Sequence, residues 1–485
     1  MKTIRKQNLL AVALVGALAC TTARAQNADP AYKFEGGYPT HETSQRLYDE
    51  LDYQRAVQAY IWATPLVNSA ALAKALTGLG VTPAEPSLLV FDNVAGPKQV
   101  GMTMNDVTLY MWSVLDVSKT GPLVVDIPEG ILGAWVDFWQ RAVEDIGAGT
   151  SLKGGKFLVL PPGYKGDVPA GYLVVRSGTN KIFLFGRGQL KPGEGAAPFI
   201  KLASTIKATP LAQEDAPKPI RVVLEGGRPF NMDWPKDYGY FDYMTEALSS
   251  EVLQPEDKLM MAMLKPLGIE MGKPFSPDDR IRRVLTKAAG TGAAMVANMA
   301  FENRFAGRQH WKDRQWEKIT FATTPDFMTD KTVELDERAQ GWYQLVMNAR
   351  YLFSAKPIPG QGSYYLSTFK DGQGQFLNGS NSYKLTMAAN QPAKNFWSVT
   401  VYDNRTRSMI DTDQQRAGRS SNTKLATNAD GSVDLYFGPT APAGKESNWI
   451  KTIPGQGFFT MVRIYGPLEP VFDGTWKLND VEKVK

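Results

Sequence analysis

Residues 154–177 read GGKFLVLPPGYKGDVPAGYLVVRS, two short apolar runs joined by a loop rich in glycine and proline. Gly149 and Gly154 have the spacing of a phosphate-binding loop, but Gly155 stands where such a loop carries lysine. The residues that follow, KFLVL, predict a strand, whereas a phosphate loop leads into a helix whose N-terminus holds the anion. The stretch therefore predicts two strands with a turning loop between them, and it argues against a nucleotide site of this class.

The same texture extends from Leu88 to about Val223, where short β-rich runs are separated by glycine and proline. The runs are SLLVF, VTLYMWSVL, PLVVDI, KFLVL, GYLVVR and KIFLF. Their spacing predicts an antiparallel β-sandwich over residues 86–235. Strands return after Tyr364 as YKLTMAA, FWSVTVYD, VDLYFG and GFFTMVRIYG, which predict a second antiparallel β-domain over residues 356–485.

Helical periodicity appears in two places outside these β-rich segments. Apolar residues recur at helical spacing from Ser44 to Ile61, with Ser44 as N-cap and Pro65 beyond the end, which predicts a helix within an arm over residues 26–85. Residues 236–355 are expected to form an α-helical domain. The fold class is thus mixed and mainly β, with helices between two β-domains.

Three helices are predicted inside the helical domain. One begins at Ser276 and Pro277 and carries an apolar stripe at steps of three and four residues. A second runs from about Val333 to Phe353, and a shorter one carries Met260, Met261 and Met263. Methionines on a helix can line a hydrophobic ligand site, although filling gaps in a core is their commoner use.

The N-terminus has the features of a secretory signal. A basic segment, MKTIRKQ, precedes the apolar run LLAVALVGALA, which is too short to span a bilayer as a helix. Ala23 and Ala25 form an A-x-A site, so residues 1–25 are predicted to be a signal peptide cleaved near Ala25, which would place the protein in the periplasm or outside the cell. The alternative is a lipoprotein anchored through Cys20. No second apolar stretch reaches transmembrane length.

Loss of this leader changes the charge and the cysteine content. The chain has 54 Lys and Arg against 49 Asp and Glu, and four of the cations lie in the leader, so the mature net charge would fall from +5 to +1. Nucleic-acid binding thereby loses its electrostatic support. Cys20, the single cysteine, is removed as well, so no thiol or disulfide is expected in the mature protein. No cofactor is expected.

Several long phrases resemble known families. TMNDVTLYMWSVLDVSKTGPLVVDIP and the stretch at 154–177 resemble the N-terminal domain-of-unknown-function family 1254. FWSVTVYDNRTRSMIDT, NWIKTIPGQGFFTMVRIYGP and the closing GTWKL resemble its usual C-terminal companion, family 1214. The resemblance implies a β-sandwich, a helical region and a jelly-roll-like C-terminal domain, and it implies no activity. The chain departs from many members at Gly133, Ala134 and Trp135, where they carry an Arg-Tyr pair.

The sequence contains few histidines for metal binding or acid–base catalysis. His41 and His310 are the two histidines, and they lie far apart in the chain. A zinc site with several histidine ligands would need both without help from cysteine, so no metal site is predicted. A Ser-His-Asp hydrolase would need one of them as its base and lacks a G-x-S-x-G elbow, although geometry alone defines a triad.

Carboxylates are better supplied in the segment YDNRTRSMIDTDQQR. Asp411 and Asp413 flank one residue, so on a strand they would share a face, as calcium ligands or as a general acid and base. Asp403 lies nearby, with Arg405, Arg407 and Arg416 beside the acids. The favoured interpretation is a turn at Asp403 with ion pairs on the surface. Calcium binding by Asp411 and Asp413 stays open.

Aromatic and polar residues of the C-terminal domain form the predicted ligand site. Such a mixed lining suits a pocket for a small molecule, a glycan or a lipid. The site residues are Trp397, Tyr402, Asn404, Trp449, Arg463 and Tyr465. Tryptophan in a β-sandwich is more often a core residue, which is the competing interpretation. At the start of an N-terminal strand, Asp106 is expected to accept bonds from backbone amides.

The sequence leads to a protein of unknown activity that binds a ligand on or beside its C-terminal β-domain. The alternative is a cofactor-free hydrolase or lyase that uses Tyr402, Asp403 and Arg463 as base, acid and anion stabiliser. A third interpretation is a structural assembly protein. Homo-oligomers are compatible with edge strands, and no sequence feature defines their order.

Overall fold

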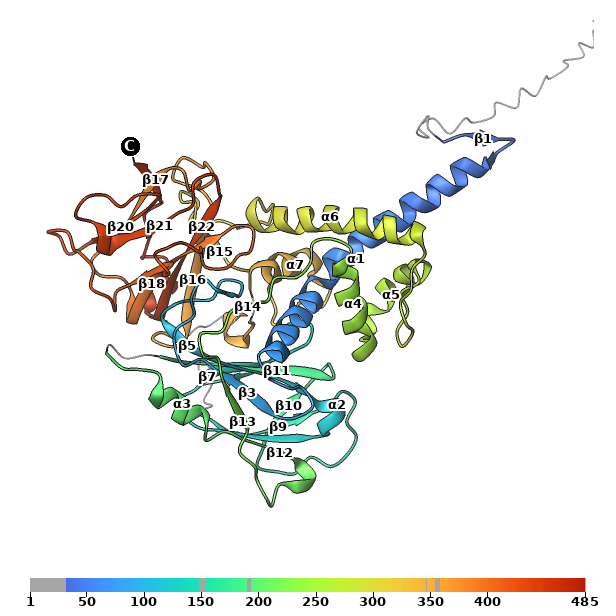
Figure 1. Ribbon diagram of the computed structural model, residues 1–485, viewed down its shortest axis with the longest axis horizontal. Coiled ribbons are helices and arrows are strands. Elements are labelled where there is room, and N and C mark those ends of the chain that lie inside the picture. The colour runs from blue at the N-terminus through green and yellow to red at the C-terminus, as the bar shows by residue number, and fades with distance from the viewer. Residues whose placement is uncertain (1–31, 148–153, 190–192, 346, 354–357, 485) are drawn as a thin grey trace, which may run out of the picture. The chain divides into compact units, whose positions relative to one another are not determined.

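The computed structural model describes residues 32–147, 154–189, 193–345, 347–353 and 358–484 (Figure 1). The predicted signal peptide and its cleavage site lie outside these residues. The chain divides into two compact units, Met1–Leu51 and Asp52–Lys485. Helices and strands contribute equally, so the mixed fold class is confirmed and the expectation of a mainly β fold is wrong. The sandwich and jelly-roll arrangements stay predictions.

The first helix is longer than its sequence pattern predicts. A short antiparallel hairpin, β1 (Phe34–Glu35) and β2 (Tyr38–Pro39), precedes α1, which runs over His41–Gly78. The prediction that this helix begins at Ser44 and stops before Pro65 is therefore wrong, because Pro65 lies inside it.

Side chains of α1 and of other elements bond to the helix backbone just before Pro65. A proline within a helix removes one backbone hydrogen bond and disturbs the turn before it. In that turn the carbonyl of Tyr60 accepts hydrogen bonds from the hydroxyls of Thr64 at 3.0 Å and Tyr240 at 2.6 Å. The carbonyl of Trp62 accepts one from the Arg338 guanidinium at 2.9 Å. These bonds tie the turn before Pro65 to α4 and α7.

Two sheets make up the N-terminal β-region, and every predicted β-rich run is found in one of them. The six-stranded sheet has the order β13 (Arg221–Leu224), β3 (Ser87–Val90), β5 (Thr108–Asp116), β11 (Lys181–Gln189), β7 (Leu132–Asp137) and β8 (Ala142–Ile146). The four-stranded sheet has the order β10 (Leu173–Arg176), β9 (Gly155–Leu160), β6 (Leu123–Ile127) and β12 (Lys207–Pro210).

The centre of the six-stranded sheet is buried on both faces. All nine residues of β5 are buried, which explains why VTLYMWSVL reads as a continuous apolar run without alternation. Leu109 and Met111 pack with residues of the four-stranded sheet in one core. Tyr110 and Trp112 lie on the other face and pack in a larger core shared with α1 and the C-terminal strands.

The strands joined by the opening stretch do not form a hairpin. β9 and β10 pair in parallel, with Leu173 opposite Phe157, so the loop carries the chain back before β10 begins. β13 and β3 are also parallel, as are the short strands β14 (Phe230–Asn231) and β4 (Gln99–Val100). The expectation of purely antiparallel pairing is therefore wrong at these edges, while the prediction of two strands and a connecting loop holds.

The helical segment contains α4 (Gly239–Ser250), α5 (Lys258–Leu264), α6 (Asp279–Phe301) and α7 (Leu335–Gln344) (Figure 1). Short helices α2 (Val117–Thr120), α3 (Ala197–Ala203) and α8 (Glu469–Phe472) lie elsewhere. The predicted helix from Val333 to Phe353 is wrong beyond Gln344. There the side-chain amide of Asn68 donates to the carbonyls of Trp342 at 2.7 Å and Leu345 at 2.8 Å, which stabilises the helix end.

The C-terminal region has two further sheets. The five-stranded sheet has the order β15 (Glu317–Lys318), β16 (Ser363–Thr368), β22 (Phe458–Pro467), β18 (Ala393–Asp403) and β19 (Gly418–Ser420), all antiparallel. The four-stranded sheet has the order β21 (Trp449–Lys451), β20 (Val433–Gly438), β17 (Ser382–Met387) and β23 (Glu482–Val484). β20 and β21 pair in parallel, so the expectation of a purely antiparallel C-terminal domain is wrong at this edge. The five-stranded sheet carries Tyr365 on β16 and Arg463 on β22, which line the candidate site.

Candidate functional site

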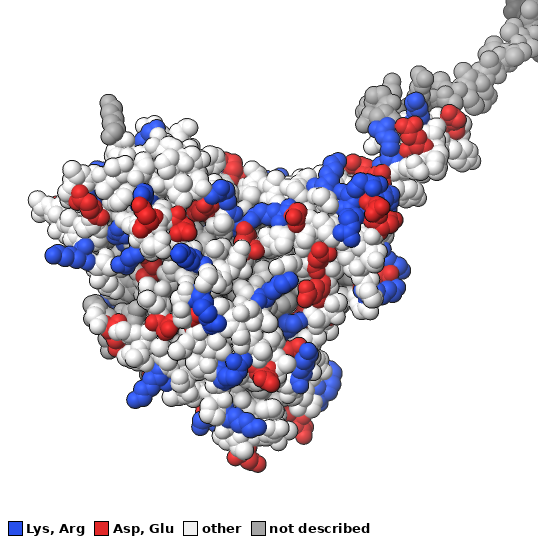
Figure 2. Space-filling view, in the orientation of Figure 1, with Lys and Arg blue, Asp and Glu red and all other residues white. Residues whose placement is uncertain are grey.

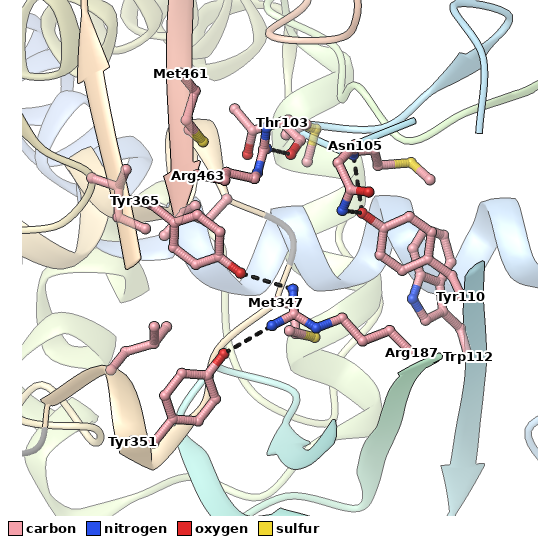
Figure 3. A pocket seen from close by; sticks show the side chains of 15 residues that line it. Thr103, Asn105, Tyr110, Trp112, Arg187, Met347, Tyr351, Tyr365, Met461 and Arg463 are labelled. Atoms are coloured by element: carbon pink, nitrogen blue, oxygen red, sulfur yellow. Dashed lines mark hydrogen bonds between the residues drawn. The ribbon is translucent and has the colours of Figure 1, made fainter. Parts of the chain in front are cut away.

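A cavity of about 70 Å³ lies among residues of the N-terminal six-stranded sheet, the C-terminal five-stranded sheet and two loops (Figure 3). Its polar lining consists of Thr103, Asn105, Tyr110, Arg187, Tyr351, Tyr365 and Arg463. We call this cavity the arginine–tyrosine pocket. No Asp, Glu, His or Lys is among its lining residues in the described chain.

Arg187 reaches the pocket because of its position in β11. Gly186 and Gly188 flank it, and their faces pack against Met111 and the ring of Phe199. A Cβ atom at Gly188 would lie within 2.4 Å of that ring, so this approach requires glycine. Since side chains alternate along a strand, Arg187 projects from the other face, where the pocket lies.

The Arg187 guanidinium is held by hydroxyl groups. Its Nη1 donates to the hydroxyl of Tyr365 at 2.8 Å, and its Nη2 donates to Ser363 Oγ at 2.9 Å and to the hydroxyl of Tyr351 at 3.4 Å. Figure 3 shows the guanidinium between the two phenols. The side chain is buried, and its residue is only 6% exposed. This arrangement fixes the cation without neutralising it.

Arg463 projects from β22, a strand whose ten residues are all buried. Its Nη1 donates to Thr400 Oγ1 at 3.2 Å, and its Nη2 donates to the carbonyl of Thr103 at 2.5 Å. The rings of Tyr365 and Tyr402 lie 5.6 Å and 5.5 Å from its Cζ atom, as in cation–π contacts. The second cation of the pocket is therefore also held by neutral groups.

Neither guanidinium forms a salt bridge with a carboxylate in the described residues. Burial acts to lower the pKa of Arg187, but the phenols of Tyr365, Tyr351 and Tyr465 outweigh it and raise that pKa. Burial opposes charge on Arg463 in the same way, and its surrounding tyrosines raise its pKa. Both arginines therefore stay cationic in a site of low polarity.

The tyrosines around the two arginines differ in acidity. Burial raises the pKa values of Tyr110, Tyr351 and Tyr402 above that of a free phenol. Burial also acts to raise the pKa of Tyr365, but Arg187 and Arg463 outweigh it and lower that pKa. Tyr365 differs because it lies beside both cations. It is the phenol of the pocket most easily deprotonated.

The remaining lining is apolar and flexible. It includes four methionines together with leucine, isoleucine and tryptophan side chains. These residues are Met102, Met104, Trp112, Ile319, Leu345, Met347, Leu352 and Met461. Methionine adapts its shape to irregular neighbours. The pocket thus combines a cationic end with an adaptable apolar wall, as small-molecule sites commonly do.

The structure brings three of the six predicted ligand residues to one side of the five-stranded sheet. Tyr402, Arg463 and Tyr465 share a face, because Tyr402 pairs with Phe459 and Ser398 with Arg463 across β18 and β22. Of these three, Arg463 lines the pocket. The Tyr402 hydroxyl donates to the carbonyl of Met104 at 2.6 Å behind it.

The other three predicted ligand residues lie elsewhere. Trp397 is buried on the opposite face of β18, in the hydrophobic core. Trp449 lies on β21 in the other sheet, where its Nε1 donates to the carbonyl of Gly438 at 2.9 Å. The Asn404 side chain packs against Gly457 at the end of β18. None of the three lines the arginine–tyrosine pocket.

The predicted carboxylate cluster is dispersed. Asp403 lies on the face of β18 opposite to Tyr402 and accepts bonds from the backbone amide of Arg405 at 2.7 Å and from its guanidinium at 3.1 Å. Asp411 and Asp413 lie outside any strand, and Asp413 pairs with Lys451 at 2.8 Å. The shared strand face expected for these two acids is absent. No group of three metal-ligating residues occurs in the described chain.

The two histidines lie in different surroundings. His41 begins α1 and is exposed, whereas His310 is half-buried with its Nδ1 atom 3.2 Å from the Tyr364 hydroxyl.

At the start of β5, the side chain of Asn105 accepts hydrogen bonds from the backbone amides of residues 107 and 108. The prediction that Asp106 makes these bonds is wrong, since the buried Asp106 carboxylate faces Gly418 without a hydrogen-bond partner in the described residues.

Sequence reasoning missed Arg187, Tyr351 and Tyr365. Arg187 did carry a signal, because an arginine between two glycines interrupts an apolar strand, FLFGRGQ, where a surface charge would not be expected. Tyr365 had no such signal. Its importance depends on the register that sets it opposite Arg463 across β16 and β22.

Comparisons with known proteins agree with the resemblance. Residues 88–210 match the family model "Protein of unknown function (DUF1254)", and residues 362–469 match "Protein of unknown function (DUF1214)". Both family predictions are therefore confirmed. Arg187 falls in the first matched segment, and Tyr365 and Arg463 fall in the second. No curated protein is significantly similar to the chain.

Two solved structures are similar to this chain over most of its length. One is a crystal structure of a protein from Vibrio parahaemolyticus, 21% identical with a TM-score of 0.54, covering 90% of this chain and 100% of that chain. The other is a putative uncharacterized protein from Burkholderia cenocepacia, 10% identical with a TM-score of 0.37, covering 91% of this chain and 97% of that one. The first likeness concerns the fold alone.

Proposed function

We propose that this chain binds a small molecule through an anionic group, a carboxylate in the first instance, in the arginine–tyrosine pocket. One observation carries the proposal: Arg187 and Arg463 are both buried, their guanidinium groups are bonded by hydroxyl and carbonyl oxygens, and neither forms a salt bridge among the described residues. Burying an unpaired cation costs free energy of folding. A site that keeps two such cations is therefore suited to an anion that arrives from outside.

The chemistry and size of the pocket narrow the ligand class. Guanidinium groups hold carboxylates through paired hydrogen bonds, which a lysine cannot reproduce. A cavity of about 70 Å³ holds a few water-sized groups, so a small acid fits better than a glycan or a long lipid. The methionine-rich wall would contact the apolar part of that acid. Of the ligand classes expected from the sequence, the small molecule is favoured.

The alternative enzyme built on Tyr402, Asp403 and Arg463 gains no support. Asp403 faces away from Tyr402 and is engaged by Arg405. Burial raises the pKa of Tyr402, and its hydroxyl is already bonded to a backbone carbonyl. A structural assembly role has no specific observation in its favour.

Calorimetry on the purified protein tests the binding proposal. Sodium acetate, glycolate, L-lactate, malonate and phosphate serve as probes of anion type. We expect at least one carboxylate to bind, and Arg463→Gln to weaken it about 10- to 100-fold, the value of one or two charged hydrogen bonds. Arg283→Gln, an exposed arginine of α6, is the matched control. Failure of every probe, or equal affinity in Arg463→Gln, would contradict the proposal.

Export to the periplasm or medium is proposed from the leader sequence. Two further observations are compatible with it. No helix in the described part of the chain has the length and hydropathy that a membrane span requires. On the face shown in Figure 2, Lys and Arg side chains lie interspersed with Asp and Glu. We also propose that the N-terminal sheets form a sandwich and the C-terminal sheets a jelly-roll-like domain.

A further inference from the structure

The phenol of Tyr365 occupies an unusual position in the arginine–tyrosine pocket. Its hydroxyl accepts a hydrogen bond from Arg187 at 2.8 Å, and Arg463 lies 5.6 Å from its ring centre. Register across β16 and β22 places Tyr365 directly opposite Arg463. One phenol is therefore in contact with both cations, and the two cations come from different parts of the chain.

Other proton-transfer groups are lacking or occupied in this pocket. Aspartate, glutamate, histidine and lysine do not line it within the described residues. The Tyr110 hydroxyl accepts from the Asn105 backbone amide at 3.0 Å and from its side-chain amide at 2.5 Å. Tyr351 accepts a long bond from Arg187 at 3.4 Å and does not share Arg463. Tyr365 is the group best placed to exchange a proton with a ligand.

Charge balance also singles out a phenolate at this position. Two buried guanidinium groups carry two positive charges, and one bound carboxylate supplies one negative charge. A deprotonated Tyr365 would supply the second, which leaves the pocket neutral. The lowered pKa of Tyr365, caused by Arg187 and Arg463 against the effect of burial, is consistent with this state.

We propose that Tyr365 is a general base that removes the proton from the carbon next to the carboxylate of the bound acid. This inference rests on the proposed carboxylate binding. The bond between carbon and hydrogen breaks, the proton joins the Tyr365 oxygen, and the electron pair moves into the carboxylate to form an enediolate. Its two negative charges lie against Arg187 and Arg463, so the total charge of the pocket is unchanged through the step.

The step needs no oxidant, metal or second substrate. Returning a proton from Tyr365 to the carbon restores the acid. If the tyrosine proton exchanges with solvent in the meantime, the acid takes up solvent hydrogen at that carbon. Return to the opposite face would invert a chiral centre. The substrate class is thus a small carboxylic acid with a hydrogen on the carbon beside the carboxyl group.

Proton nuclear magnetic resonance in D₂O measures this exchange directly. Each probe that binds in calorimetry, among glycolate, L-lactate and malonate, is incubated with the wild-type protein and with Tyr365→Phe. We expect the wild-type protein to accelerate deuterium uptake at the carbon. The Tyr365→Phe variant should still bind the probe but should exchange at least about 100-fold more slowly. Tyr48→Phe, which changes an exposed tyrosine of α1 outside the pocket, is the matched control and should keep the exchange.

A spectroscopic titration provides a second readout that needs no ligand. The near-ultraviolet absorbance of tyrosinate should show one phenol ionising below the ordinary tyrosine pKa of about 10 in the wild type, and Tyr365→Phe should lack it. Bound probes without exchange, or undiminished exchange in Tyr365→Phe, would overturn the general-base assignment alone. Absence of any binding would overturn the proposed function and this inference together.

Discussion

Arg187 and Arg463 are the two residues on which the candidate site depends. Each is fixed by hydroxyl or carbonyl oxygens, so each is oriented without a salt bridge in the described residues. Arginine suits this task because its planar fork is held by several bonds at once and still presents donors to a ligand. At the residue scale, the site is therefore prepared for an anion before the anion arrives.

A substitution at Gly188 tests whether the packing behind β11 holds the Arg187 side chain in the pocket. Gly188→Ala would place a Cβ atom within 2.4 Å of the Phe199 ring, so β11 or the ring must shift. We expect a loss of about 1–3 kcal/mol in the free energy of unfolding and weaker carboxylate binding. Gly195→Ala, which has open space around it, is the control. Denaturant unfolding and calorimetry measure both effects, and equal stability of the two variants would contradict this account.

His310 predicts a pH dependence of stability. Burial, with a smaller effect of Lys318, lowers its pKa from 6.5 to about 4. A lowered folded-state pKa means that the folded protein binds the proton less tightly than the unfolded chain. Stability is therefore full above pH 6.5 and is lost as the pH falls toward 4, by about 1–2 kcal/mol after allowing for partial exposure of the ring.

Comparison of variants isolates the contribution of His310. Buried acids with raised pKa values, such as Glu251, change stability in the opposite direction, so the wild-type curve alone is a sum. His310→Gln should remove the loss between pH 6.5 and 4, whereas His41→Gln, at the exposed start of α1, should retain it. Parallel curves for wild type and His310→Gln from denaturant unfolding would refute the assignment.

At the scale of helices and strands, the place where α7 ends and the faces that the strands present determine where the pocket forms. α7 ends at Gln344, and Leu345, Met347 and Tyr351, the last in the short 3-10 helix Arg350–Phe353, line the pocket. A helix continued to Phe353 would wind these residues around an axis and withdraw some of them. The early end of α7 is therefore part of how the site is built.

Asn68 is expected to stabilise that helix end. Its amide, fully buried on α1, donates to two carbonyls at the end of α7. Asn68→Ala would leave both carbonyls without these donors, and we expect a loss of about 2–3 kcal/mol in the free energy of unfolding. Asn422→Ala, at an exposed position, is the control and should change stability by less than about 0.5 kcal/mol. Similar unfolding midpoints for both variants would argue against the role of Asn68.

At the scale of the whole molecule, the pocket combines residues of both matched segments with residues from the region between them. Arg187 donates to Tyr365 and Ser363, and Arg463 donates to the carbonyl of Thr103, so each segment holds the cation of the other. Arg407, fully buried, adds a further link through bonds to the Tyr343 carbonyl and to Asp233. Neither matched segment of this chain contains the whole pocket lining.

Export is also a property of the whole chain and is open to direct measurement. Intact mass analysis of protein secreted by a host with its own leader machinery should give a mature chain that begins at Gln26. Replacing Ala23 and Ala25 together by leucine should block cleavage, because the peptidase accepts small side chains there. A mature chain that begins at a lipidated Cys20 would instead favour the lipoprotein alternative.

Much of the secondary structure follows from local sequence pattern. The runs VTLYMWSVL, KFLVL and FWSVTVYD all form strands where expected, and the helix after Ser276 forms as α6. These predictions succeed because burial of one or both faces of a helix or strand sets the pattern of apolar residues along it. That pattern can be seen in the local sequence alone. Tyr402, Arg463 and Tyr465 share a face for the same reason.

Only the tertiary structure decides which faces meet. Tyr240 and Arg338 bond the backbone before Pro65 from distant positions, and Asn68 of α1 bonds the carbonyls at the end of α7. Arg187 and Tyr365 become partners through sheets that the sequence keeps far apart. Local periodicity reports whether a side chain is buried, whereas the identity of its neighbour depends on how whole sheets pack, and that packing is where the candidate chemistry of this protein arises.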